Sequence, residues 1–411
     1  MAEKDRKPEI RFKGFADHWE QRKLTYEVEL FSGLTYSPND VIKEGGTLVL
    51  RSSNVKNGEI INADNVYVKS DAVNVDNVQV GDIIVVVRNG SRSLIGKHGQ
   101  IKVKMDNTVI GAFMTGMRSS NSSFINTLLS TPVFDKEVEK NLGATINQIT
   151  NSMFQNMYFM FPNEDEQIKI GDYFSNIDNL VTLHQRKYDK LVKVKKSMLE
   201  KMFPKNGADV PEIRFKGFTA PWEKRKLGEY CEMYNGDRGI NYPSEKDMVS
   251  DGIPFINAGD LKNGRVNLSN ANKITREKYS QLGGAKLQLG DIVYCLRGTL
   301  GKNAFIDNFN EGTVASSLVA LRPKNIDGKY LFHILNSDIE FRQRTVCDEG
   351  AAQPNLSAKS LGGFDIPIPK IEEQIRLSGY LDSLDNLITL HHRKLEKLKN
   401  IKNSCLEKMF V

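Results

Sequence analysis

Cysteine and histidine are scarce in this chain. Four cysteines and six histidines occur among 411 residues, and all four cysteines lie in the second half. No two cysteines have the close spacing of a zinc-binding motif, and the scattered histidines form no group of metal ligands. We therefore expect neither a metal site nor a disulfide framework, which is typical of a protein from a reducing compartment.

Long hydrophobic runs are also missing. No stretch approaches the roughly 20 apolar residues that a bilayer-spanning helix needs. Residues 1–7 are mostly charged and lack the apolar core of a secretory signal, so we expect a cytoplasmic protein. The net charge of +6 permits nucleic-acid binding but does not establish it.

An internal repeat organises the chain. Residues 8–24 recur as residues 211–227 with 13 of 17 positions identical, including the only two tryptophans, Trp19 and Trp222. Residues 166–203 recur as residues 373–410 with 21 of 38 positions identical. The chain is therefore a tandem duplication of about 200 residues. Because the tryptophans lie in the most similar stretch, we expect them to anchor a core.

The two copies differ more between the repeated blocks, yet landmarks keep the same order. The sequence Gly-Asp-Ile occurs at residues 81–83 and 290–292, and an arginine follows each time, at Arg88 and Arg297. The intervening segments are rich in β-branched and apolar residues, which predicts short strands. We infer that each copy is a similar β-rich scaffold with its own loops.

Each copy ends in a predicted long helix. From Glu166 and Glu373 onward, hydrophobic residues alternate spacings of four and three, which is typical of a coiled-coil seam. Matching seam positions hold the polar pairs His184 with His391 and Lys195 with Lys402. A lone polar residue in such a seam fixes register more often than it binds metal.

This layout resembles the specificity subunit of type I restriction-modification enzymes over nearly the whole chain. The resemblance rests on the Pro-Glu-Ile-Arg-Phe-x-Gly-Phe opening of each copy, the Gly-Asp-Ile stretch, and Pro-x-x-x-Glu-Gln at residues 162–167 and 369–374. It implies a mixed α/β fold with two similar β-rich target-recognition domains, separated by two long antiparallel coiled-coil helices, and an internal pseudo-two-fold symmetry. The expected segments are target-recognition domains at 8–165 and 211–371, spacer helices at 166–203 and 372–410, and a linker at 204–210.

The resemblance also implies a function and partners. Each domain would read one half of a split DNA site, while the paired helices would set the spacer and dock two methyltransferase subunits. Two restriction subunits, which carry the motor, would complete the assembly. No cofactor is expected in this chain, since S-adenosylmethionine, ATP and Mg²⁺ are expected on the partner subunits. A helix of some 38 residues is roughly 55 Å long, enough to separate two modules by more than one duplex turn of about 34 Å.

Polar and basic residues in the predicted loops are the candidate DNA contacts. Arginine can read guanine, asparagine and glutamine can read adenine, and basic side chains bind phosphate. The candidates are Asn54, Lys56, Arg88, Ser91, Arg92, Lys97, Asn147 and Gln148 in the first copy, and Lys262, Asn263, Arg297, Thr299, Lys302, Gln353 and Asn355 in the second. Plainer roles stay open, because basic residues also occupy solvated hairpins and amides also shape turns or cap short helices.

Catalysis within the chain is not expected. An amino-methyltransferase would need a loop like Asn-Pro-Pro-Tyr, and the sequence contains no Pro-Pro pair. Asp82 and Asp291 are isolated, whereas a nuclease needs clustered carboxylates around a metal. Neither of the matching Gly-Lys pairs, at residues 96–97 and 301–302, is followed by Ser or Thr, so a phosphate-binding P-loop is not indicated. The alternative is a self-contained methyltransferase or nuclease with its own recognition domains.

Overall fold

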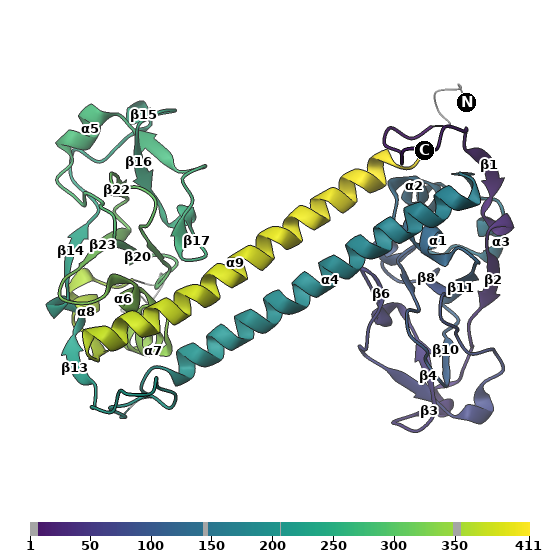
Figure 1. Cartoon of the computed structure of the whole chain (residues 1–411), viewed down its shortest axis with the longest axis horizontal. Helices are drawn as coiled ribbons and strands as arrows, with labels where there is room; N and C mark the ends of the chain where they lie inside the picture. The colour runs from purple at the N-terminus through teal and green to yellow at the C-terminus, as the bar shows by residue number, and fades with distance from the viewer. Residues whose placement is uncertain (1–6, 143–146, 206, 348–354) are drawn as a thin grey trace. The chain divides into compact units, whose positions relative to one another are not determined.

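The structure, a computed structural model, describes residues 7–142, 147–205, 207–347 and 355–411. Contacts divide the chain into two compact units. Unit 1 comprises Met1–Gln185 with Arg393–Val411, and unit 2 comprises Arg186–His392. Each unit combines sheets with helices, so the predicted mixed α/β fold is confirmed (Figure 1).

Unit 1 is built around a central sheet with the strand order β2-β11-β8-β9-β6-β5. An outer sheet has the order β10-β4-β7-β3, and β1 pairs with β12. Strand β8 is Ile-Ile-Val-Val and wholly buried, as expected for a strand covered on both faces. The bounds are β1 Glu20–Lys23, β2 Glu29–Ser32, β3 Val41–Ile42, β4 Thr47–Leu50, β5 Val55–Lys56, β6 Gly58–Ile60, β7 Val66–Val68, β8 Ile83–Val86, β9 His98–Gln100, β10 Thr108–Ile110, β11 Met114–Arg118, α1 Ser122–Leu128, α2 Pro132–Asn141, α3 Asn151–Gln155 and β12 Tyr158–Phe161.

Unit 2 follows the same plan, with a four-stranded central sheet and a separate hairpin in place of the six-stranded sheet. Its central sheet has the order β14-β23-β20-β21, its outer sheet the order β15-β19-β16-β22, and β13 pairs with β24 as β17 does with β18. A short α-helix, α5, takes the place of a single 3-10 turn, Ser70–Ala72, in unit 1. The bounds are β13 Glu223–Lys226, β14 Cys231–Asn235, β15 Met248–Val249, β16 Ile253–Ile256, β17 Leu261–Lys262, β18 Arg265–Val266, β19 Asn272–Ile274, α5 Arg276–Gln281, β20 Ile292–Cys295, β21 Asn303–Phe305, β22 Thr313–Val314, β23 Leu318–Pro323, α6 Gly328–Ile334, α7 Asp338–Cys347, α8 Ala358–Gly362 and β24 Asp365–Ile368.

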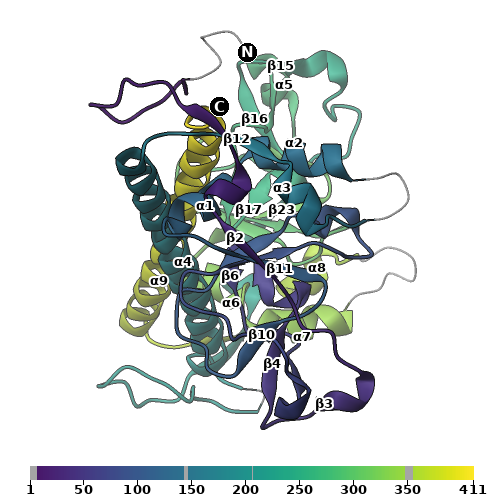
Figure 2. The same cartoon turned by 90° about the vertical axis from the view of Figure 1, so that its right-hand side faces the viewer.

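The layers follow the same order in both units. In unit 1, α1 and α2 lie on one side of the central sheet and the outer sheet lies beyond its other side (Figures 1 and 2). In unit 2, α6 and α7 take the place of α1 and α2, and the outer sheet again lies on the far side (Figure 1). The shared plan means that a residue of one unit can be judged against its structural counterpart in the other.

The predicted long helices are α4, Glu164–Lys201, and α9, Ile371–Lys408. Both units contain a part of each helix, and the two parts pack together. In unit 1, Asp178 pairs with Lys402 at 2.6 Å while Tyr173 contacts Cys405, so residue numbers rise on one helix as they fall on the other. In unit 2, Lys195 pairs with Asp385 at 2.5 Å, and the rings of Tyr188 and His392 lie 5.5 Å apart. The helices are therefore antiparallel within each unit, as predicted, and both seam lysines bind an aspartate across the seam.

The repeated sequence blocks meet where each long helix begins. Arg11 forms a bidentate ion pair with the fully buried Glu166, with both N–O distances 2.7 Å, and Arg214 binds Glu373 in the same way. These hydrogen bonds raise the pKa of both guanidinium groups. The Pro-Glu-Ile-Arg opening and the Glu-Gln helix entry are thus two halves of one contact, which explains why both recur.

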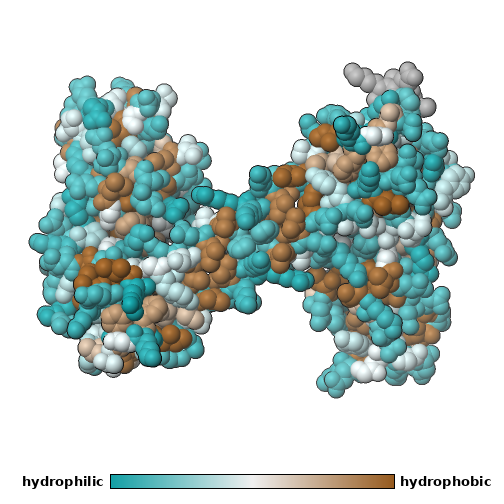
Figure 3. Space-filling view, in the orientation of Figure 1, coloured by the Kyte–Doolittle hydropathy of each residue, from teal (hydrophilic) through white to brown (hydrophobic). Residues whose placement is uncertain are grey.

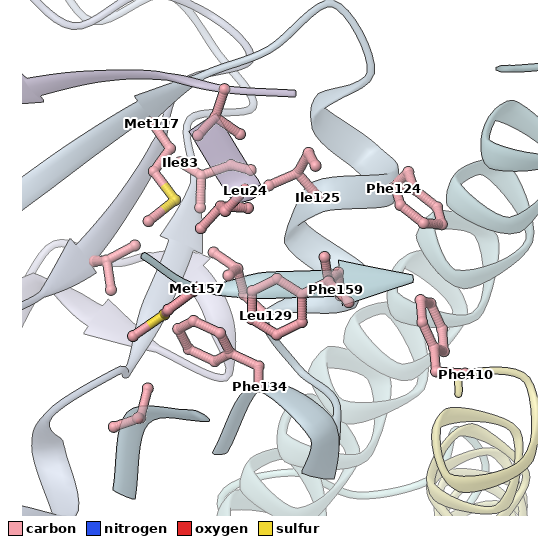
Figure 4. Packing of buried hydrophobic residues seen from close by; sticks show 14 of the residues in the cluster. Leu24, Ile83, Met117, Phe124, Ile125, Leu129, Phe134, Met157, Phe159 and Phe410 are labelled. Atoms are coloured by element: carbon pink, nitrogen blue, oxygen red, sulfur yellow. The ribbon is translucent and has the colours of Figure 1, made fainter. Parts of the chain in front are cut away.

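Each core is completed by a phenylalanine two residues past the end of a long helix. In unit 1, the ring centroid of Phe410 lies 5.8 Å from that of Phe124 (Figure 4) and 5.9 Å from that of Trp19. In unit 2, Phe203 lies 6.4 Å from Trp222. Both tryptophans are buried core residues, as predicted. Within the described ranges, no helix combines the length and apolar composition needed to cross a membrane.

Candidate nucleic-acid interface

The two landmark arginines follow the innermost strands of the central sheets. Arg88 lies just past β8 and forms an isolated antiparallel bridge with Gln148, and Arg297 lies just past β20 and forms one with Asn355. Both arginine side chains are exposed. The structure therefore brings together candidate residues that are about 60 positions apart in the sequence, and it does so in the same way in each unit.

In unit 1 the arginine lies over an aromatic ring. The Cζ atom of Arg88 is 5.0 Å from the ring centroid of Phe113, whose side chain is 55% exposed. The Asn147 side chain donates to the carbonyl of Gly90 at 3.1 Å, which joins the two loops. Phe113 was missed in the sequence because it sits in a turn without a repeated counterpart. An aromatic residue between polar turn residues was the available signal.

In unit 2 the arginine is held by an amide. Arg297 Nε donates to Asn355 Oδ1 at 3.1 Å, and both residues line a cavity of about 690 Å³. Arg238 and Lys359 contribute further positive charge to its wall, and Tyr234 adds an aromatic ring. None of these three was among the sequence candidates, because the loops that carry them differ between the copies. Gln353 lies outside the described residues.

The other candidates near these arginines differ in exposure. Ser91 and Arg92 are exposed in a turn, and Thr299 is exposed in the corresponding turn of unit 2. Lys97 is half-buried. Lys302 is half-buried too, and its ammonium donates to the carbonyl of Ala258 at 2.7 Å, so this lysine already supports a neighbouring loop.

The candidates in the predicted turns sit on a pair of matching hairpins. Lys56 and Lys262 are exposed, and each precedes an Asn-Gly pair in the left-handed conformation that a tight hairpin turn requires. Asn263, the first residue of its pair, is exposed as well. Asn54 is fully buried, accepts from the Arg51 amide at 2.9 Å and donates to backbone carbonyls. It shapes the turn, so it is not available to DNA in this structure.

The Gly-Asp-Ile aspartates are structural residues. Asp82 accepts two hydrogen bonds from Arg118, both at 2.9 Å, and Asp291 accepts two from Arg322 at the same distance. These bonds raise the pKa of both guanidinium groups, and the carboxylates are almost fully buried. Where the structure describes the chain, no three His, Cys, Asp or Glu side chains are grouped to hold a metal ion.

Together, these features define a recognition protein built twice on one scaffold. The framework contacts are the same in both units, whereas the polar surfaces around the two landmark arginines differ. Residues 16–193 and 220–400 match the family described as the type I restriction modification DNA specificity domain. The chain belongs to that family and carries its domain twice, which confirms the resemblance noted in the sequence.

Individual relatives agree with this assignment. The type I restriction enzyme MjaVIII specificity subunit of Methanocaldococcus jannaschii is 24% identical over 279 residues, which is 64% of this chain and 64% of that protein. The EcoBI specificity subunit of Escherichia coli is 26% identical over 173 residues, 40% of this chain and 36% of that protein. The matches thus span less than two thirds of these relatives' lengths.

A solved structure shares the fold. The crystal structure of the S subunit of a type I restriction-modification system from M. genitalium aligns with a TM-score of 0.67 and 18% sequence identity. The alignment covers 98% of this chain and 99% of that one. It therefore includes both units and both long helices.

Proposed function

We propose that this chain is the DNA-reading specificity subunit of a type I restriction-modification complex. Each unit reads one half of a two-part DNA site, and the chain carries out no chemistry itself. One observation carries this proposal: the two units share their framework contacts but surround Arg88 and Arg297 with different side chains. A duplicated scaffold with different readers suits a site whose halves differ in sequence.

The residues proposed to face DNA are the exposed and half-buried candidates around these arginines and on the hairpins. They combine positive charge, which binds phosphate, with amides and guanidinium groups that can read base edges. In unit 1 they are Lys56, Arg88, Ser91, Arg92, Lys97, Asn147 and Gln148. In unit 2 they are Lys262, Asn263, Arg297, Thr299, Lys302 and Asn355.

The partner surface lies on the long helices. Residues 178–185 and 385–392 are nearly identical between the copies, and each stretch exposes two leucines one turn apart. Leu180 and Leu183 of α4 are about as exposed as Leu387 and Leu390 of α9, and hydrophobic residues are visible along the helices (Figure 3). Exposed apolar patches mark interaction sites. Because the same patch occurs twice, we propose that it docks two copies of one partner, the methyltransferase subunit.

The remaining assignments follow from this role. Two restriction subunits with motor activity would join the full assembly, and S-adenosylmethionine, ATP and Mg²⁺ would bind to partner subunits rather than to this chain. The complex would work in the cytoplasm, where the DNA is. With 38 residues each, α4 and α9 are about 57 Å long, and we propose that they set the spacer between the half-sites.

The test is to express the chain with its methyltransferase partner and to sequence the modified adenines. We expect one two-part motif with an unspecified spacer. Replacing the region between β1 and β12 of unit 1 with that of a relative should change one half of the motif only. Methyl transfer or DNA cleavage by the isolated chain, given S-adenosylmethionine and Mg²⁺, would favour the self-contained enzyme instead.

A further inference from the structure

We propose that unit 2 reads a guanine through Arg297 and that Asn355 is the positioning residue for this reading. The inference rests on the proposed function, which assigns DNA to this surface, and goes beyond it by naming a base. It starts from the way in which the guanidinium group is held.

The hydrogen bond to Asn355 leaves one edge of the guanidinium group available. Nε is committed to Asn355 Oδ1 at 3.1 Å, whereas Nη1 and Nη2 make no hydrogen bond to any described residue. These two nitrogens form a pair of parallel donors in a fixed plane. In the major groove, guanine presents O6 and N7 as two neighbouring acceptors that suit such a pair. The available edge therefore matches guanine.

The partner of Arg297 is neutral, and this sets it apart from the framework arginines. Arg118 and Arg322 each donate two hydrogen bonds to a buried aspartate, which both compensates their charge and occupies their donors. An amide oxygen orients a guanidinium group without compensating its charge. Arg297 is thus oriented like a framework arginine but keeps both its charge and its outer donors.

The backbone adds rigidity to this arrangement. Arg297 and Asn355 form an antiparallel bridge, and the amide of Leu356 donates to the carbonyl of Leu296 at 2.9 Å. Both side chains therefore project from two backbone segments that are hydrogen-bonded to each other. A phosphate contact needs only a positive charge within reach, as a flexible lysine supplies, whereas a fixed planar fork gives geometric selectivity. The rigid setting therefore favours base reading over phosphate binding.

The cavity beside Arg297 offers room for a base edge. It measures about 690 Å³, and Arg238 and Lys359 give its wall further positive charge. Asp237 also lines it, but its carboxylate accepts hydrogen bonds from the amides of Gly239 and Gly283, both at 2.9 Å. These bonds tie the acidic group to its own loop, so it does not occupy the donors of Arg297.

Unit 1 provides the internal comparison. The place of Phe113 is taken in unit 2 by Ser317, since the amides of Val87 and Leu296 donate to the carbonyls of these two residues. Arg88 therefore stacks on a ring, while Arg297 is held by an amide. The two arginines should serve different halves of the site.

The experiment uses the full chain in complex with its methyltransferase partner, on duplexes that carry the mapped two-part motif. Binding is measured for the wild type, Arg297→Ala, Arg297→Lys, Asn355→Ala and the matched variant Arg88→Ala, over a salt series. Each guanine of the motif is replaced in turn by 7-deazaguanine, which lacks the N7 acceptor, and by inosine, which keeps O6 and N7. Thermal unfolding of each variant checks that it is folded.

We expect 7-deazaguanine at one position of one half-site to weaken wild-type binding about tenfold or more. Inosine at that position should have little effect. Arg297→Ala and Arg297→Lys should lose the discrimination at this position alone, although the second keeps the charge. Asn355→Ala should reduce the same discrimination and no other. Arg88→Ala should alter only the opposite half-site.

Two failures can be told apart. If Arg297→Ala weakens all duplexes equally and lowers the salt dependence, Arg297 binds phosphate, and the inference is overturned while the proposed function stands. The inference is also overturned if, at every guanine of the motif, the analogues affect the wild type and these variants equally. If the wild-type complex produces no two-part motif at all, the proposed function fails, and this inference fails with it.

Discussion

At the scale of single residues, bidentate arginine–carboxylate pairs occupy the same places in both units. Arg11–Glu166 and Arg214–Glu373 fasten the start of each copy to its long helix. Arg118–Asp82 and Arg322–Asp291 fasten neighbouring strands of each central sheet. A buried carboxylate is costly unless its partner stays in place, so these pairs constrain the chain more than exposed pairs do.

Removing one partner of such a pair should destabilise its unit. Glu166→Gln leaves the guanidinium of Arg11 mostly buried without a counter-charge, and we expect a loss of about 3 kcal/mol in the free energy of unfolding of unit 1. Urea unfolding of the full chain measures it. Glu373→Gln should act equally on unit 2. Asp106→Asn removes an exposed ion pair with Lys104 and should change nothing measurable, and an equal effect of all three variants would contradict the argument.

A buried histidine should make unit 1 sensitive to acid. Burial lowers the pKa of His98 from 6.5 to about 4. Between these two pH values the unfolded chain binds more protons than the folded one, so the stability contributed above pH 6.5 is lost as the pH falls towards 4. The full loss is about 3 kcal/mol.

The second unit supplies the substitution that tests this. Asn303 takes the place of His98 in β21, and its amide donates to the carbonyl of Gly301 at 2.8 Å as the His98 ring contacts that of Gly96. His98→Asn should therefore keep the local contact and flatten the pH dependence of unit 1 between pH 4.5 and 6.5. Unfolding by urea at several pH values gives the slope, and an unchanged slope would exclude His98 as its source.

The roles of single residues could be predicted from the sequence where the same residues recur in both copies. Trp19 and Trp222 are buried as expected, because they sit in the most similar block. The burial of Asn54 and the stacking of Arg88 on Phe113 were not predictable. Both depend on segments that are brought together by strand pairing, and one sequence does not reveal that pairing.

At the scale of elements, the two hairpins are held by ion pairs of opposite polarity. In unit 1, Glu59 of the hairpin binds Lys102 at 2.9 Å. In unit 2, Arg265 occupies the place of Glu59 and approaches Asp307, which occupies that of Lys102, at 3.6 Å. The hairpin position is the same while the charges are exchanged. The ion pair therefore fixes the hairpin, and the sign of each charge is secondary.

Exchanging the charges in unit 1 should test this. Glu59→Arg alone brings two cations together and should loosen the hairpin, with a cost of about 1 kcal/mol for these partly exposed groups. Adding Lys102→Asp should restore most of the stability that the hairpin loses. Hydrogen exchange of residues 55–60 measures the local opening. If the double variant is no better than the single one, the pair does not hold the hairpin.

The exposed leucines of the long helices should govern partner binding. Leu180→Ser with Leu183→Ser should remove one methyltransferase subunit from the complex, and Leu387→Ser with Leu390→Ser the other, because we propose that each patch docks one copy. Native mass spectrometry counts the subunits. Val192 is also exposed on α4 but has a lysine as its counterpart, so Val192→Ser should leave two subunits bound.

Helices and strands could be predicted from the sequence when they were long enough to show a repeating pattern of hydrophobic residues. The helices α4 and α9 show the heptad spacing over 38 residues each, and the sequence therefore indicated them clearly. Strands such as β3 and β15 have two residues, too few for any period. The strands of the outer sheets have only two to four residues, and their pairing depends on tertiary contacts.

At the scale of the whole molecule, the proposed spacing role of the long helices can be tested by lengthening them. One heptad inserted after Leu191 of α4 and one inserted after Thr389 of α9 lengthen both helices by about 10 Å and keep the seam in register. We expect the same half-sites to be methylated across a spacer about 3 bp longer. A library with randomised spacers, methylated and sequenced, gives the answer. An active variant with an unchanged spacer would show that the helices do not set it.

Phe410 completes the core of unit 1, although most of unit 1 is the first part of the chain to be synthesised. Unit 2 is one continuous stretch, so all of its residues are synthesised before residues 393–411 are added. Unit 1 begins first but must wait for α9 to deliver Leu406, Met409 and Phe410 to its core. Its apolar interior stays open in nascent chains, exposed to chaperones and proteases, until translation has passed unit 2. Premature termination within α9 would therefore damage the unit that was translated earliest.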